Sequence, residues 1–429
     1  MAEFKNWSEL VCFSPREIYA PENEEALIAF IKQCAAEKRS VRVVGSGHSF
    51  TRLVETDDAL ISLDKIQGLI SHDATKTQAT VWAGTKIKAL GGLLANIGMA
   101  QPNLGDIDVQ SIAGAISTGT HGSGVTLGSI ATQVVGLRLI TATGEALDCS
   151  PTQNADVFKA AQVSFGMLGI ITRVTLQCVP AYTLDYHWYA KPLSEVLAEL
   201  PALKQNRNFE FFWIPHTEQT LVKVMNATNQ APRKKGLWRR FNENVLENAV
   251  LGMLSAYTRR FPSQAPRVAR LIASLVSGGH DVTASHETFA TVRAVKFYEM
   301  EYNIPIEHFA AVLTEIKETI ARERIAVSFP VEARFVAADD IPLSPAYQRQ
   351  AAYIAVHQFK GMPHEAYFAS IEAIFRRYQG RPHWGKLHTR TVDELRALYP
   401  KWADFMALRK KFDPNGMFVN RYLRPYVEG

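Results

Sequence analysis

Two glycine-rich segments about 65 residues apart constrain the fold of this 429-residue chain more than any other feature. The first, VVGSGHSF over residues 43–50, runs from an apolar stretch into Gly45-Ser46-Gly47. Glycines can adopt positive φ there and let successive backbone N–H groups point into one concavity, as in a nest that binds a pyrophosphate. The segment is not a Rossmann fingerprint, because Phe50 occupies the place of the third glycine, and it is not a Walker A loop. A tight turn without a ligand is the alternative.

The second segment, QSIAGAISTGTHGSG over residues 110–124, favours a bound cofactor. It combines several glycines with small hydroxyl residues. Small side chains let the backbone approach a ligand closely, while the hydroxyls of Ser111, Ser117 and Thr118 can bond phosphates or the edge of a ring. A third piece, FGMLGIITRVTL over residues 165–176, places another glycine turn before a strand. Together the segments predict a site that embraces one extended dinucleotide.

Hydrophobic periodicity indicates two domains of mixed α+β structure. A chain of this length exceeds what one core usually supports, and its character changes near residue 180. Before that point short β-branched runs alternate with turns, including a hairpin at Thr143-Gly144, and after it aromatic residues and histidine are more frequent. Predicted helices cover residues 23–38 (capped by Asn23), 86–98, 306–321 and 367–378. Predicted strands fall within residues 40–47, 59–64, 78–84, 134–150, 170–176, 209–215, 325–336 and 353–359.

The formal charge of +5 is too small for this length to indicate a nucleic-acid partner, even with a sequence pI near 8.9. The sharpest basic cluster, RKKGLWRRF over residues 233–241, precedes an apolar-rich stretch. A solvated face or loop is the favoured interpretation of this cluster, and contact with a membrane surface is the alternative. No run of about 18 apolar residues occurs in the sequence. We therefore expect no membrane association.

The cysteines and the N-terminal segment favour a cytoplasmic protein. Cys12, Cys34, Cys149 and Cys178 form no CxxC pair and have no metal-ligand spacing, which is typical of thiols in a reducing compartment. We expect no disulfide bond and no metal site. Residues 1–15 carry acidic side chains and lack the apolar core of a secretory signal.

The ordered blocks of this sequence resemble the vanillyl-alcohol-oxidase-type (PCMH-type) FAD oxidoreductases. Within them the chain is similar to the group of sugar-1,4-lactone oxidases, which includes gulonolactone and arabinonolactone oxidases, and alditol oxidases. The resemblance spans nearly the whole chain and rests on VGSGHSF, IAGAISTGTHGSG, LGIITRVTL, FEFFWIPHT, EMEYNIP, VEARFVAADDIPLSPAYQR, HWGK and DPNGMFVN. It implies a two-lobed FAD-binding domain over residues 10–180 and a sugar-lactone-oxidase-type C-terminal domain over residues 181–429. In the latter, a mixed α/β cap at about residues 181–378 would cover the flavin ring, and residues 379–429 would return to the flavin.

The resemblance also implies FAD as the cofactor, joined covalently through its 8α-methyl group to His48 of the HS motif. An imidazole substituent should raise the flavin potential and prevent loss of the cofactor. The alternative is a turn histidine that bonds only to backbone, since some relatives bind FAD without the covalent link. The residues that the resemblance places around the cofactor are Val44, Gly45, Ser46, Gly47, His48, Ser49, Phe50, Ser111, Gly114, Ser117, Thr118, Gly119, His121, Gly122, Ile171 and His383.

Glu332 and Arg334 of the VEARF block lie two apart on a predicted strand, so their side chains share a face. Taken alone this is an ordinary surface ion pair, but the resemblance implies that both side chains point at the substrate and the flavin. Arg334 and Lys386 would orient substrate hydroxyls and stabilise developing negative charge, while Glu332 would position a hydroxyl and accept its proton. Trp384 would form an apolar wall, and Ser111 resembles the family serine between flavin and substrate.

The resemblance implies oxidation of an aldono-1,4-lactone of the gulono or arabinono type. A hydride would pass to flavin N5, and O2 or another acceptor would reoxidise the flavin. His357 stands where alditol oxidases carry a threonine, which favours a lactone over an open-chain polyol, although an isolated histidine on a strand is usually structural. An alditol oxidase that forms an aldose and H2O2 is the alternative enzyme. A flavin-binding protein without turnover is the alternative of another class, and the VEARF and HWGK blocks argue against it.

Overall fold

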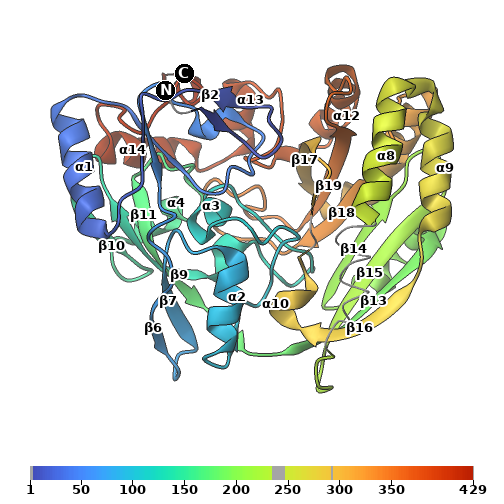
Figure 1. The fold of residues 1–429 in the computed structure, drawn as a ribbon, viewed down its shortest axis with the longest axis horizontal. Helices are drawn as coiled ribbons and strands as arrows, with labels where there is room; N and C mark the ends of the chain where they lie inside the picture. The colour runs from blue at the N-terminus through green and yellow to red at the C-terminus, as the bar shows by residue number, and fades with distance from the viewer. Residues whose placement is uncertain (1–2, 234–246, 291–292, 429) are drawn as a thin grey trace.

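The computed structural model describes residues 3–233, 247–290 and 293–428 and confirms a mixed α+β architecture (Figure 1). Two sheets built by the N-terminal half lie beside one large sheet built by residues 183–382. The predicted basic cluster at residues 233–241 lies outside the described residues, apart from Arg233. Within the described ranges, no helix is both long enough and apolar enough to cross a bilayer.

The N-terminal half forms a three-stranded parallel sheet and a five-stranded antiparallel sheet. The parallel sheet has the order β3-β5-β4, with β3 Glu17–Tyr19, β4 Val41–Val44 and β5 Ala59–Ser62. The antiparallel sheet has the order β10-β9-β11-β7-β6, with β6 Leu69–Asp73, β7 Gln78–Trp82, β9 Val134–Ile140, β10 Ala146–Cys149 and β11 Ile170–Gln177. Two short strand pairs are β1 Phe4–Lys5 with β2 Cys12–Phe13, and β8 Met99–Ala100 with β12 Val179–Pro180.

Local sequence signals explain where the elements of this half begin and end. The side chain of Asn23 accepts a hydrogen bond from Ala26 N–H at 2.8 Å and caps the first helix, as predicted. The predicted hairpin is also confirmed, because β9 pairs with β10 across Gly144, which has a φ of +76°. The helices of this half are α1 Glu24–Ala36, η1 Arg52–Val54, α2 Ile87–Ala95, α3 Ile112–Ser117, η2 Ile130–Gln133 and α4 Ala155–Ala161.

The C-terminal half is built on one eight-stranded antiparallel sheet with the order β16-β13-β15-β14-β18-β19-β17-β20. Its strands are β13 Thr183–Pro192, β14 Asn208–Trp213, β15 Gln219–Thr228, β16 Gly279–Ala284, β17 Phe297–Pro305, β18 Val331–Val336, β19 Ala351–Phe359 and β20 Arg381–Pro382. Its helices are α5 Leu193–Ala198, α6 Leu200–Leu203, α8 Glu247–Arg260, η4 Pro262–Gln264, α9 Ala265–Leu275, α10 Ser285–Thr288, η5 Ile306–His308, α11 Phe309–Arg322, α12 Glu365–Arg377, α13 Val392–Leu398, α14 Trp402–Phe412 and α15 Arg424–Glu428.

One predicted strand is shorter than its hydrophobic run. The run covers residues 325–336, but β18 contains only Val331–Val336. Pro330 precedes the strand and has no N–H to donate to a neighbouring strand, so pairing starts after it. The shortened strand still contains both Glu332 and Arg334.

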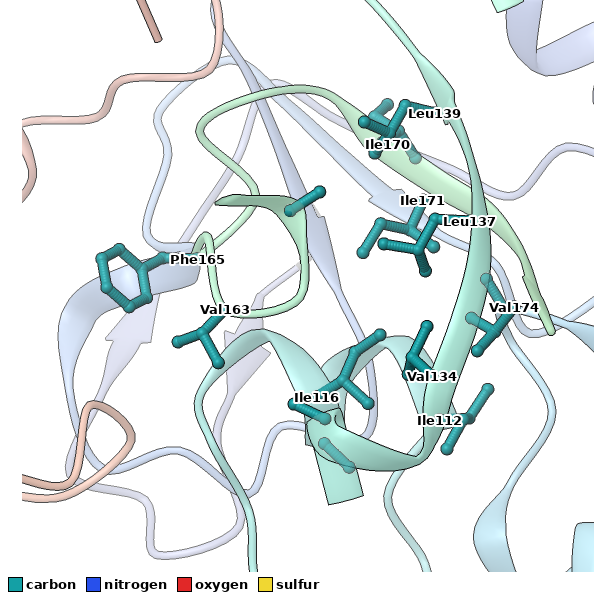
Figure 2. Close-up of a cluster of buried hydrophobic side chains, with 14 of the residues drawn as sticks. Ile112, Ile116, Val134, Leu137, Leu139, Val163, Phe165, Ile170, Ile171 and Val174 are labelled. Carbon is teal, nitrogen blue, oxygen red and sulfur yellow. The ribbon is translucent and has the colours of Figure 1, made fainter. Parts of the chain in front are cut away.

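The C-terminal segment packs into the core of the N-terminal half. Figure 2 shows part of that core, where side chains of α3, β9 and β11 meet. The same buried cluster contains Trp384, Tyr399, Trp402 and Phe418. Buried Arg42 of β4 fastens the segment further, since its guanidinium donates hydrogen bonds to the carbonyl oxygens of Leu53, Phe165 and Phe418. All four cysteines are free.

Candidate functional site

Two adjoining cavities contain most of the predicted site residues. The glycine-lined cavity holds about 1050 Å³ of empty space, including space open to solvent, and lies among the end of β4, the start of α3 and the turn before β11. The charged cavity holds about 790 Å³, counted in the same way, against β17, β18 and β19. His48, Ser49, Gln110 and Thr118 line both cavities, which therefore meet at these residues.

The glycine-lined cavity depends on close backbone packing around Ser111. The Ser111 hydroxyl accepts a hydrogen bond from Gly114 N–H at 3.3 Å and so caps α3. A Cβ on Gly45 would lie 2.6 Å from Ser111 Oγ, and a Cβ on Gly114 would lie 2.9 Å from it, so either substitution would displace the cap. Gln110 Oε1 is buried at the junction of the cavities without a hydrogen-bond partner among the described residues. Exposed backbone, hydroxyls and this unpaired oxygen fit an extended dinucleotide such as FAD.

The predicted cofactor residues divide between the two cavities. Those that line only the glycine-lined cavity are Val44, Gly45, Ser46, Gly47, Ser111, Gly114, Ser117 and Ile171. Phe50, His121 and His383 line only the charged cavity, and His48, Ser49 and Thr118 line both. Gly119 and Gly122 line neither. Gly119 has a φ of +78°, and a Cβ on Gly122 would lie 2.2 Å from Leu104 O, so these two glycines serve the backbone of the motif.

His48 lies where the cavities meet and carries a neutral ring. It stacks on Trp7 with ring centroids 5.5 Å apart. Burial, reinforced by the positive charges of Lys386 and Lys86, lowers the pKa of His48 to about 4. A neutral imidazole keeps a lone pair on one ring nitrogen, so His48 is in the protonation state that a bond to carbon requires.

Glu332 and Arg334 point into the charged cavity, as the alternation along a strand predicts. Arg334 Nε lies 2.5 Å from Glu332 Oε1 and 3.0 Å from Glu210 Oε2, which belongs to the adjacent strand β14. Burial raises the pKa of the Glu332 carboxyl; Arg334 opposes this rise, while the nearby carboxylates of Glu210 and Asp106 add to it. A carboxylate with a raised pKa accepts a proton more readily, which suits a general base.

Lys386 and His357 meet at Glu299 on β17. Lys386 Nζ lies 2.5 Å from Glu299 Oε2, and His357 Nε2 lies 3.6 Å from Glu299 Oε1. The other ring nitrogen of His357 lies 2.9 Å from the carbonyl oxygen of Pro330. Burial alone would raise the pKa of Glu299, but Lys386 and His357 more than reverse this and hold it at about 2. All three side chains line the charged cavity, so His357 faces this cavity as well as belonging to the sheet.

A second carboxylate of β17, Glu301, contacts His121 and lies near His383. His121 Nε2 lies 3.1 Å from Glu301 Oε1, and His121 Nδ1 lies 2.9 Å from Gly122 O. Both neighbours are hydrogen-bond acceptors, so each ring nitrogen of His121 faces one acceptor. His383 Nδ1 accepts a hydrogen bond from Gly385 N–H at 3.1 Å, so a neutral His383 carries its proton on Nε2. Ligand atoms of His121, Glu301 and His383 lie within 4.8 Å of one another, but these bonds already account for the cluster without a metal ion.

Several residues of the charged cavity were not predicted from the sequence. Glu299 and Glu301 are two apart in the EMEYNIP block, the same spacing that identified Glu332 and Arg334, so strand alternation could have found them. Asp106 and Arg293 also line the cavity and form an ion pair. They lie outside regular elements and far apart in the sequence, so no periodicity marks them.

Buried His383 should make stability depend on pH. Burial lowers its pKa to about 4, below the ordinary value of 6.5. Between these values the unfolded chain binds a proton that the folded protein does not. The free energy of unfolding should therefore rise with pH from 4 to 6.5, and His383 should add no pH dependence below 4 or above 6.5. His383→Asn keeps an acceptor near Nδ1 but does not titrate, and should flatten the rise by about 1–3 kcal/mol. Urea unfolding from pH 4 to 7.5 measures this, with exposed His72→Asn as control; equal pH slopes for His383→Asn and wild type would contradict it.

Comparisons with known proteins agree on one family. The model of an FAD binding domain matches residues 15–150, and the model of D-arabinono-1,4-lactone oxidase matches residues 174–426. The chain is 41% identical to L-gulono-1,4-lactone dehydrogenase of Mycobacterium tuberculosis over 98% of both chains. It is 34% identical to L-gulonolactone oxidase of Bos taurus over 98% of this chain and 97% of that protein. A crystal structure of cholesterol oxidase from B. sterolicum has the same fold, with a TM-score of 0.84 and 17% identity over 99% of this chain and 96% of that one.

Proposed function

Because this chain belongs to the D-arabinono-1,4-lactone oxidase family and carries an FAD-binding domain, we propose that it oxidises an aldono-1,4-lactone of the gulono or arabinono type. The protein is an FAD-dependent oxidoreductase of this family. FAD, when bound, supplies the acceptor for the hydride at N5. One observation carries the proposal: the glycine-lined cavity meets a cavity that contains Glu332, Arg334 and Lys386.

Each charged group has a role that its surroundings support. Glu332 accepts the proton of the substrate hydroxyl as the hydride leaves the same carbon, because its raised pKa favours the protonated form. Arg334 and Lys386 orient the hydroxyls and stabilise negative charge that develops in the transition state. Glu210 and Glu299 hold these two cations in place. Ser111, which belongs to the second glycine segment and packs against Gly45 of the first, serves as the serine between flavin and substrate.

The charged cavity suits a neutral, polyhydroxylated substrate. It presents carboxylates together with Arg293, Arg334 and Lys386, and so offers both acceptors and donors to several hydroxyl groups. His357 lines this cavity and stands where alditol oxidases carry a threonine, which supports a lactone over an open-chain polyol. The relative at 41% identity is named for L-gulono-1,4-lactone. An alditol oxidase is the second candidate, since a polyol would use the same proton acceptor and cations.

Four further features belong to this proposal. The neutral ring of His48 supports a covalent flavin link at that residue. The electron acceptor is O2 or another oxidant. Residues 10–180 form the FAD-binding domain and residues 181–429 the C-terminal domain, with a cap at about 181–378 and a segment at 379–429 that returns to the flavin. The four free cysteines support a cytoplasmic location.

A substrate panel distinguishes the candidates. Steady-state rates should be measured with L-gulono-1,4-lactone, D-arabinono-1,4-lactone and an open-chain polyol such as sorbitol, each with O2 and with an artificial dye as acceptor. We expect a lactone to give kcat/KM at least about tenfold above the polyol, which corresponds to about 1.4 kcal/mol of transition-state binding. A polyol that matches or exceeds both lactones would select the alditol oxidase, and no turnover of either class would support a flavin-binding protein without activity.

A further inference from the structure

The outer edge of the eight-stranded sheet carries a cluster of two histidines and one aspartate that the oxidation chemistry does not use. His187 of β13 lies directly opposite His280 of the edge strand β16. Asp185 lies two residues before His187 and therefore on the same face of the sheet. All three side chains are partly exposed, by 47% for His187, 38% for His280 and 30% for Asp185, so an ion in solution can reach them.

The ligand atoms of these side chains converge on one point. His280 Nε2 lies 2.5 Å and His187 Nε2 lies 3.1 Å from the same Asp185 Oδ1, and all three atoms lie within 4.8 Å of one another. The two imidazole rings stack with centroids 4.3 Å apart, and their planes differ by 19°. Tetrahedral ligands of a zinc ion stand about 3.4 Å from one another, given bonds of about 2.0–2.2 Å. The cluster therefore needs only a small side-chain rotation to surround such an ion.

From this geometry we propose that Asp185, His187 and His280 form a binding site for a divalent transition-metal ion such as Zn²⁺. Imidazole nitrogens and one carboxylate suit Zn²⁺, Ni²⁺ or Cu²⁺ and not Mg²⁺ or Ca²⁺, which prefer all-oxygen sites. Three protein ligands leave the fourth position of a tetrahedral ion to water. Each histidine binds through Nε2 and carries its proton on Nδ1, which is the neutral form of the ring.

The position of the site indicates a structural effect and not a part in catalysis. The site lies on β13 and β16, and β13 is separated from β18, which carries Glu332 and Arg334, by three strand spacings of about 4.8 Å each. The edge strand β16 follows α9 in the chain. Within the described residues, its one neighbouring strand is β13. An ion held by His280 and the β13 ligands would join this edge to its neighbour and stabilise the folded protein, by an amount that grows with the logarithm of the ion concentration above Kd.

Isothermal titration of Zn²⁺ into the FAD-loaded, tag-free protein tests the site. We expect one ion per chain at these residues, with affinity reduced at least about tenfold by His187→Ala and by His280→Ala, since even loss of an outer-shell partner costs about 10–100-fold. The matched control His72→Ala removes an exposed strand histidine elsewhere and should bind as wild type does. Lactone oxidation should be unchanged in all three variants.

Two results would overturn the site. One is the absence of Zn²⁺ binding by the wild-type protein at millimolar concentration. The other is binding whose affinity and stoichiometry are the same in wild type, His187→Ala and His280→Ala, because the ion would then sit elsewhere. Circular dichroism of each variant shows whether it is folded, and Asp185→Asn, which keeps the shape of the side chain, repeats the test without removing a ring. The Zn²⁺-binding and circular-dichroism readouts do not depend on whether the protein oxidises a lactone.

Discussion

Replacing Arg334 by alanine should nearly abolish reduction of the flavin by substrate while FAD stays bound. Arg334 lies in the charged cavity, where its Nε is 2.5 Å from Glu332 and 3.0 Å from Glu210. Its loss removes a cation from the site of developing negative charge and takes away the ion-pair partner that Glu332 and Glu210 share. Removal of one such electrostatic group costs about 10²–10³ in rate. Anaerobic stopped-flow measurement of flavin bleaching by lactone gives the rate directly.

The controls for this variant separate charge from geometry. Arg334→Lys keeps the positive charge but loses the planar fork that faces two carboxylates, so it should recover only part of the rate. Arg322→Ala removes an exposed arginine of α11 and should leave the rate unchanged. Bound FAD, measured by absorbance, should be equal in all variants. If lactone bleached the flavin of Arg334→Ala at the wild-type rate, this arginine would have no role in the reaction.

The proposed covalent link predicts that His48→Ala holds its flavin without a covalent bond. The His48 ring lies where the cavities meet and is neutral, with a pKa lowered to about 4 by burial and neighbouring cations. After acid denaturation and washing, we expect wild-type protein to keep its yellow colour and the variant to lose all of it. The flavin potential of the variant should also fall, because the imidazole substituent is gone.

Exposed His72→Ala serves as the matched control for the covalent link and should keep the colour. A colourless wild-type precipitate would refute the link altogether. A yellow precipitate of His48→Ala would place the bond at another residue.

The parts of the fold that the sequence predicts correctly depend on local signals. Asn23 caps α1, and Gly144 turns the β9–β10 hairpin, because each contact joins residues that are close in the chain. The order of the eight-stranded sheet depends on pairings between distant residues. Strand β17 enters between β19 and β20, and no local preference of its residues indicates those neighbours. The packing of Trp384 and Phe418 into the N-terminal core is equally non-local.

The candidate site shows the same division. Alternation along one strand placed Glu332 and Arg334 on a common face, and the structure brings both into the charged cavity. Glu210 was not predicted, because its contact with Arg334 arises from pairing between β14 and β18. Gly122 was predicted to contact the cofactor because it belongs to the glycine motif, but it lines neither cavity. A side chain at Gly122 would collide with the backbone oxygen of Leu104, so close backbone packing explains the glycine.

The anaerobic spectrum of the purified protein tests the account most directly. Addition of L-gulono-1,4-lactone or D-arabinono-1,4-lactone without oxygen should bleach the visible flavin absorbance within one turnover, and admission of an acceptor should restore it. A flavin that stays oxidised with both lactones, in folded protein with full FAD content, would contradict lactone oxidation at the junction of the two cavities.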